Sequence, residues 1–237
     1  MSAVPPWSSW DELGADPARV GVYGFARSYA EHRADATAVV PPYFFRGRLT
    51  DVAVGDEPVV MALADGRLLA EEVELVLLLS RERAAAPFTV TGYTFGNDPT
   101  DLTEFREDAA RIQWAKAPRA ALSAGFWSSP AAPESVEAVV ERLSADGAVT
   151  TYRAALGHAH VVLPPNRIPE VVGRFAGADG FDHVLLYTGA PRGLAWREEP
   201  PRGLRAGDLL SLAVTGHGVV LRTRVRPERA TSSPVAG

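Results

Sequence analysis

The chain has 237 residues, of which 46% are hydrophobic, and its formal net charge is −5 at pH 7. This length and composition suit one large folded domain, and the acidic charge does not suit a protein that binds nucleic-acid phosphates. Cysteine is absent, which excludes disulfides and thiolate metal sites. The N-terminus lacks a secretory signal and the apolar runs are too short to cross a bilayer, so we expect a soluble cytoplasmic protein without a membrane partner.

In the first half of the chain, most apolar segments have the spacing of strands. Residues 1–20 contain Pro, Ser and Trp and predict an irregular arm, followed by a strand at 20–23. Helix-forming residues with a charged face predict a short helix at 28–36. Turn signals then separate several predicted strands between 43 and 80, and alternation predicts another strand at 88–95.

In the second half, helical and extended patterns are mixed. We expect a helix at 102–114, a loop at 118–134, and a strand or short helix at 135–143. The remaining elements are a helix at 167–175 and strands at 184–187, 209–214 and 219–225. Many strands and few helices predict an α/β chain that is mainly β.

Residues 68–80 carry acidic side chains into a strongly apolar segment. Alternate residues of a strand share a face, so Glu72 and Glu74 are predicted to be neighbours about 7 Å apart. The run at 75–79 is apolar on both faces, which predicts a central, buried strand. Such a carboxylate pair requires solvent at a strand end, nearby arginines, or a hard divalent cation such as Mg²⁺, Mn²⁺ or Ca²⁺.

A single lysine, Lys116, stands among the 24 lysine and arginine residues of the chain. Arginine serves as the cation everywhere else, so this lysine was retained either by chance or for its compact ammonium, whose pKa can shift. Without further context, a surface cation at a helix end explains it as well.

Two histidines form a second candidate metal motif. If residues 154–162 were a strand, His158 and His160 would share a face and could bind Zn²⁺. No third ligand follows at local spacing, which favours a structural role for the pair.

Several separated segments of the chain have an order and spacing typical of one enzyme family. They are ARSYAEH at 26–32 followed by Asp35, EVEL at 72–75, GYTFGND at 92–98 followed by IQWAK at 112–116, LLYTGAPRG at 185–193, and LRAGDLLSLAVTGHG at 204–218. Together they resemble the fumarylacetoacetate hydrolase family. The resemblance implies a catalytic domain at 21–226, between the arm at 1–20 and a flexible tail at 227–237.

The resemblance implies a mixed β-sandwich roll with a few short helices, usually in a homodimer. It places the metal ligands of the family on Glu72, Glu74 and Asp98, with Mg²⁺ as the expected ion and Mn²⁺ or Ca²⁺ as alternatives. The active-site lysine of the family coincides with Lys116, which its rarity in the composition had already singled out.

The resemblance also implies a His–acid dyad on a mobile lid, at His32 and Asp35, where Asp replaces the usual Glu. Arg27, Tyr29 and Thr188 are the substrate-binding residues that it implies. The expected substrate is a small 2-oxo acid or β-diketone, whose C–C bond would be hydrolysed by water activated by the dyad.

The chain departs from the family pattern at positions that hold substrate. Leu102 replaces an arginine, Ala190 a threonine, and Ser28 an asparagine. These losses keep a second reading open, in which the same site serves a decarboxylase, isomerase, hydratase or cyclase. A third reading, a non-catalytic homologue, is opposed by the retained acids, lysine and histidine.

Overall fold

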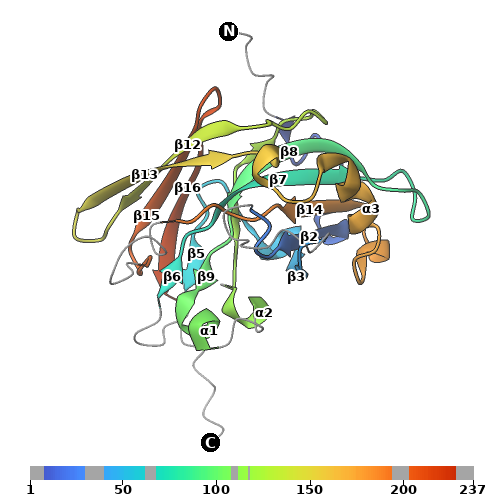
Figure 1. Cartoon of the computed structure of the whole chain (residues 1–237). Helices are drawn as coiled ribbons and strands as arrows, with labels where there is room; N and C mark the ends of the chain where they lie inside the picture. The colour runs from blue at the N-terminus through green and yellow to red at the C-terminus, as the bar shows by residue number, and fades with distance from the viewer. Residues whose placement is uncertain are drawn as a thin grey trace, which may run out of the picture.

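The protein is built mostly from strands arranged in two curved sheets (Figure 1). The computed structural model describes residues 8–29, 40–61, 68–107, 112–116, 118–193 and 203–227. Within these residues, both sheets mix parallel and antiparallel pairs, in agreement with the predicted mainly β, sandwich-like roll with few helices.

The larger sheet carries the segment that the sequence marks as acidic and apolar. In the described residues its strands follow the order β3 (Tyr43–Arg48), β2 (Val20–Phe25), β14 (His183–Tyr187), β7 (Val73–Ser80), β8 (Thr89–Asn97), β10 (Ala121–Leu122) and β4 (Ala53–Val54). β7 lies in the middle of this order and is buried on both faces, which confirms the prediction from its apolar run.

The smaller sheet packs against one face of the larger one. Its described strands follow the order β13 (Val149–Leu156), β12 (Val136–Leu143), β15 (Leu209–Val214), β16 (Gly218–Pro227) and β5 (Val59–Met61). Two short pairs complete the extended structure: β1 (Ser8–Ser9) with β11 (Gly125–Phe126), and β6 (Leu69–Ala70) with β9 (Thr100–Asp101).

The described helices are short and lie at the edges of the sheets. α1 (Leu102–Glu107) and α2 (Ile112–Ala115) follow β9, and α3 (Ile168–Val172) precedes β14. Single 3₁₀ turns occur at Pro17–Arg19, Leu49–Asp51, His158–His160, Pro165–Arg167 and Ala178–Gly180. No helix in the described ranges combines the length and apolar character that a membrane crossing requires.

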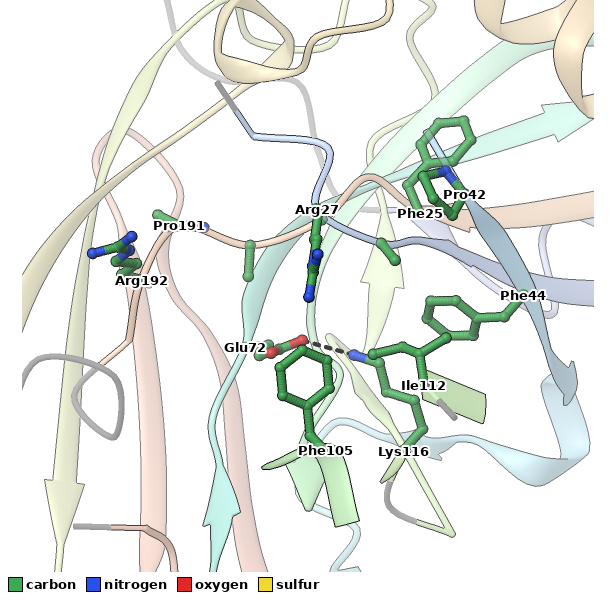
Figure 2. A pocket seen from close by; sticks show the side chains of 13 residues that line it. Phe25, Arg27, Pro42, Phe44, Glu72, Phe105, Ile112, Lys116, Pro191 and Arg192 are labelled. Atoms are coloured by element: carbon green, nitrogen blue, oxygen red, sulfur yellow. Dashed lines mark hydrogen bonds and ion pairs between the residues drawn. The ribbon is translucent and has the colours of Figure 1, made fainter. Parts of the chain in front are cut away.

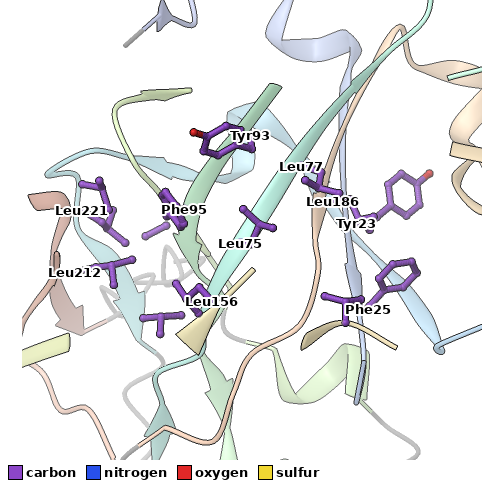
Figure 3. Packing of buried hydrophobic residues seen from close by; sticks show 14 of the residues in the cluster. Tyr23, Phe25, Leu75, Leu77, Tyr93, Phe95, Leu156, Leu186, Leu212 and Leu221 are labelled. Carbon is purple, nitrogen blue, oxygen red and sulfur yellow. The ribbon is translucent and has the colours of Figure 1, made fainter. Parts of the chain in front are cut away.

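The main hydrophobic core lies between the two sheets (Figure 3). Leu75 and Phe95 of the larger sheet meet Leu156, Leu212 and Leu221 of the smaller one. Each of these side chains is at most 2% exposed, and burial of one such side chain contributes about 1.5–3 kcal/mol. The core therefore holds β7 rigidly, together with the acidic residues at its N-terminal end.

Three expectations about secondary structure need correction. The predicted strand at 68–80 is interrupted, and Glu72 lies between β6 and β7 because its N–H donates to the Asn97 side chain, 2.8 Å away. The predicted loop at 118–134 contains the short strands β10 and β11. The histidine pair lies in a 3₁₀ turn, because Gly157 at φ 144° ends the extended backbone after β13.

The predicted helix at 28–36 falls mostly outside the described residues. Its first two positions are not helical, because Tyr29 forms an isolated bridge with Val161 and the Ser28 carbonyl accepts a hydrogen bond from Val162 N–H. In the expected arm, residues 8–9 pair with β11, and Trp10 packs near Phe126. The tail from residue 228 lies outside the described residues.

Candidate active site

Glu72 and Asp98 are held together by the ends of two neighbouring strands. The N–H of Asp98 donates to the carbonyl of Glu72 over 2.9 Å, and Asn97 Oδ1 accepts from Glu72 N–H over 2.8 Å. These bonds extend the β7–β8 pairing past the register of Val73 with Asn97. Both carboxylates therefore leave the backbone at the same edge of the larger sheet.

Lys116 joins the two carboxylates from the C-terminal end of α2. Its Nζ lies 2.7 Å from Glu72 Oε2 (Figure 2). The same Nζ lies 2.9 Å from Asp98 Oδ2 and donates to the Asp98 carbonyl over 3.1 Å. A backbone bridge between Thr100 and Lys116 fixes this approach. The lysine is therefore placed by main-chain pairing, and its compact ammonium contacts two acids at once.

The charge of Lys116 is maintained by its surroundings. Burial alone lowers the pKa of Lys116, but the charges of the nearby carboxylates, Asp98 foremost, outweigh burial and raise its pKa above 10.5. The ring of Phe44 lies 5.3 Å from the ammonium and presents a favourable cation–π surface. Lys116 is therefore a cation at neutral pH, suited to stabilise negative charge and unsuited to accept a proton.

Arg46 is a site residue that the sequence reasoning missed. It lies on β3, its Nε is 2.9 Å from Asp98 Oδ1, and its side chain is 8% exposed. Arg46 lies two residues from buried Phe44 in an otherwise apolar strand segment, and an arginine in such a segment requires a charged partner when it is buried. That was the available signal, but it was one arginine among many.

Glu74 lies deeper than Glu72 and is almost free of solvent contact. It is 2% exposed, and its Oε2 accepts a hydrogen bond from Gly189 N–H over 2.6 Å. Burial raises the pKa of Glu74 well above its usual 4.5, and the charges of Asp98 and Glu72 raise it further, while Lys116 opposes the shift. A second positive charge near Glu74 would relieve this unfavourable ionisation.

Gly189 follows β14 and makes this contact possible. Its φ is 93°, and a Cβ at this position would lie 1.9 Å from Ser28 Oγ. Ser28 in turn donates from that hydroxyl to the Thr188 carbonyl. Only glycine allows the chain to pass between Ser28 and the Glu74 carboxylate.

The donor chemistry of the three acids fits a hard divalent cation. Both Asp98 oxygens are fully buried, and each faces a cation at 2.9 Å: Arg46 Nε lies beside Oδ1 and Lys116 Nζ beside Oδ2. Carboxylate oxygens of this kind are the ligands that Mg²⁺ prefers. Among the residues that the structure describes, however, no three acidic, histidine or cysteine side chains already surround a common metal position.

A pocket of about 560 Å³ reaches this cluster, and Glu72 and Lys116 form part of its wall (Figure 2). This volume lies within the roughly 300–1,000 Å³ typical of small-molecule sites. Glu74 and Asp98 lie behind that wall, buried from solvent. The site therefore combines an open cavity with buried acidic residues that lie next to it.

The structure brings some of the remaining predicted residues to the pocket and leaves others away from it. Arg27 lines the pocket, whereas Tyr29 and Thr188 are not part of its described lining. The Thr188 hydroxyl donates to the Leu75 carbonyl over 2.8 Å, which ties β14 to β7. His32 and Asp35 lie outside the described residues.

The histidine pair does not form a metal motif. His160 Nε2 lies 2.8 Å from Ser135 Oγ, and its ring stacks on Tyr29 at a centroid distance of 6.0 Å. These contacts support the structural role that the sequence favoured.

The model of the family described as fumarylacetoacetate (FAA) hydrolase C-terminal matches residues 21–226. The chain belongs to the fumarylacetoacetate hydrolase family. No curated protein matches it in sequence.

Solved structures share the fold of this family member at low sequence identity. A 2-keto-3-deoxy-D-arabinonate dehydratase in its apo form is 18% identical, with a TM-score of 0.72. The match covers 90% of this chain and 74% of that chain. The same dehydratase has been solved with magnesium and 2,5-dioxopentanoate, at 18% identity, a TM-score of 0.68 and the same coverage. A 5-carboxymethyl-2-hydroxymuconate delta-isomerase from Mycobacterium smegmatis is 20% identical, with a TM-score of 0.65 and coverage of 90% and 80%.

These neighbours are named as enzymes with different reactions. One is a dehydratase and another an isomerase, so the shared fold does not select hydrolysis. Family membership of this chain establishes an enzyme scaffold, and its reaction depends on the residues of the site.

Proposed function

We propose that this protein is a divalent-metal-dependent enzyme that cleaves a C–C bond in a 2-oxo acid or β-diketone. One observation carries the proposal: Glu72 and Asp98 converge on Lys116 at the wall of an open pocket, with buried Glu74 behind them. A buried acidic cluster of this kind is expensive to maintain without a function.

The proposed metal ligands are Glu72, Glu74 and Asp98. A bound divalent ion would polarise the two oxygens of an oxo acid as a Lewis acid. Magnesium is the expected ion, supported by the related dehydratase that was solved with it. Since Lys116 contacts both Glu72 and Asp98, those two oxygens can ligate an ion only if the lysine gives up contacts to them.

Lys116 and Arg27 supply the fixed positive charge of the proposed reaction. The ammonium of Lys116 would stabilise the enolate that forms when the C–C bond breaks. Arg27 lines the pocket and would bind a substrate carboxylate.

His32 and Asp35 complete the proposed hydrolysis, on the strength of the family resemblance. His32 would remove a proton from a water molecule, and the oxygen of that water would add to the C4 carbonyl carbon of a 2,4-dioxo acid. The bond from that carbon to the methylene group then breaks, giving a carboxylic acid and a 2-oxo acid whose methylene takes up the proton. We also propose a homodimer, which analytical ultracentrifugation can check.

A second candidate function is a non-hydrolytic reaction through the same enolate, such as isomerisation, dehydration or decarboxylation. Leu102, at the position of the family arginine, is fully buried and packs in a cluster with Ala70, so it offers no charge to the substrate. Ala190 lines the pocket without the expected hydroxyl. A reaction that needs fewer substrate contacts is compatible with both changes.

Metal content and substrate turnover test the proposal in sequence. Wild-type protein, Glu72→Ala and the surface control Glu137→Ala are dialysed against Mg²⁺ or Mn²⁺, and bound metal is measured by mass spectrometry. We expect loss of metal in Glu72→Ala alone; equal metal in all three refutes the ligand assignment. Acylpyruvates and oxaloacetate, assayed with and without Mg²⁺, then separate hydrolysis from decarboxylation.

A further inference from the structure

The pocket has two chemically different sides (Figure 2). Phe44 and Ile112 lie on one side of the Glu72–Lys116 pair, and Pro191 and Arg192 lie on the other. Arg27 extends toward this pair from a third direction. A ligand over Glu72 and Lys116 therefore meets hydrocarbon in one direction and positive charge in another.

The apolar side is formed by residues from three separate segments. Phe25, Pro42, Phe44 and Ile112 all line the pocket. Phe44 is 2% exposed and also faces the Lys116 ammonium, so its ring is held in place by packing. The described lining on this side offers no hydroxyl, amide or carboxylate side chain, so a hydroxylated substrate tail would lose hydration there without replacement bonds.

The positive charge at the pocket comes from Arg27 and Arg192, which approach the Glu72–Lys116 pair from two directions. Arg27 has φ of 51°, and it is the only non-glycine residue in the described ranges with a left-handed backbone. Such a conformation costs about 1–3 kcal/mol and tends to persist at functional sites. Its guanidinium carbon lies 5.8 Å from the centre of the Phe105 ring, which restricts where the charge can point.

We infer that the substrate is an amphipathic 2-oxo acid, with its carboxylate toward Arg27 and an aryl or alkyl tail against Phe44 and Ile112. This inference rests on the proposed function, because it assumes that the oxo-acid head occupies the Glu72–Lys116 position. It adds a substrate class: acids with an apolar tail are bound in preference to sugar acids and to diacids of similar size.

Calorimetric titration with three stable oxo acids tests this preference. Pyruvate presents the head alone, phenylpyruvate adds an apolar ring, and 2-oxoglutarate adds a charged tail. In the presence of Mg²⁺, we expect phenylpyruvate to bind at least about tenfold more tightly than pyruvate, as burial of one ring predicts. We expect 2-oxoglutarate to bind no more tightly than pyruvate.

Two variants test which pocket residues bind the apolar tail of the ligand and which bind its carboxylate head. Ile112→Asn should reduce phenylpyruvate affinity at least about fivefold and leave pyruvate affinity unchanged. Arg27→Gln should weaken both ligands by a similar factor. Val149→Asn and Arg153→Gln, which change exposed residues on β13, serve as matched controls and should bind both ligands as the wild type does.

The outcomes separate this inference from the function on which it rests. If pyruvate and phenylpyruvate bind equally, or 2-oxoglutarate binds best, the apolar-tail preference is wrong and the oxo-acid site stands. If none of the three binds with Mg²⁺ present, the proposed function fails and the inference fails with it. Because the wild-type series decides the preference by itself, a misfolded variant would leave the test intact.

Discussion

Two strands, one from each sheet, carry glutamates in very different surroundings. β12 alternates buried and exposed residues, and its Glu137 and Glu141 point to solvent. β7 is buried on both faces, and its Glu74 is 2% exposed. The same side chain is therefore an ordinary solvated group on β12 and an unusual buried acid on β7.

The partners of these glutamates differ as much as their exposure. Glu137 pairs with Arg153, and the two side chains are 52% and 65% exposed. Such surface pairs contribute about 0–1 kcal/mol, because solvent screens them. Removing one partner from a buried cluster costs about 3–5 kcal/mol, because an uncompensated charge remains. A buried charged cluster is therefore the better candidate for a functional site. Mutations can measure the difference in stability between the buried and the exposed groups.

The largest effect is expected from Lys116→Met. In chelator-treated protein, we predict a loss of about 3–5 kcal/mol in the free energy of unfolding, because Glu72 and Asp98 lose their shared cation. Arg119→Met is the matched control, since Arg119 pairs with Glu57 at 30% and 52% exposure and should cost at most about 1 kcal/mol. Urea unfolding of both variants measures the comparison, and equal losses would contradict it.

The metal affinity of the same lysine variant gives an independent readout. Lys116→Met removes a positive charge beside the proposed ligands, so we expect Mg²⁺ or Mn²⁺ to bind more tightly in calorimetry while turnover is lost. Weaker metal binding would show that the lysine supports the ion instead of competing with it.

The next effect concerns how stability depends on pH at Glu74. Burial, and then the charge of Asp98, raise the pKa of this carboxyl above 4.5 in the folded protein. Between pH 4.5 and the raised pKa, Glu74 therefore takes up a proton when the chain folds. The stability that Glu74 contributes in this way is complete below pH 4.5 and is lost as the pH rises toward the raised pKa. Within that window, the free energy of unfolding should fall by about 1.4 kcal/mol per pH unit.

Glu74→Gln should abolish this fall, because glutamine can still accept the Gly189 hydrogen bond and does not ionise. Unfolding curves for both proteins between pH 4.5 and 8, in chelator, provide the measurement. Parallel curves for wild type and variant would mean that the buried carboxyl does not change protonation on folding.

The sequence predicts β7 well because the necessary information is local. Residues 75–79 are apolar on both faces, and this pattern requires a central strand wherever the partners come from. The carboxylates at its start were identifiable for the same reason. Lys116 could be singled out by composition alone, since it is the only lysine.

The rest of the site depends on contacts between distant segments, which no local pattern specifies. Arg46 lies on β3, which β2 and β14 separate from β7 in the strand order, and yet it contacts Asp98. In the sequence it is one arginine among many. The histidine motif was misplaced because Gly157, directly before His158, ends the extended backbone of β13. The two-sided pocket joins segments near residues 25, 44, 112 and 190, so only the folded chain reveals its polarity.

The smallest effect is expected on β12, where Glu137→Gln removes one member of the exposed pair with Arg153. We predict a change of at most about 0.5 kcal/mol in the free energy of unfolding, which should shrink further in 1 M salt because screening weakens surface pairs. Urea unfolding at low and high salt measures it. A loss comparable with that of Lys116→Met would mean that exposure does not determine the energy of these acids, and the contrast between the two strands would no longer point to the active site.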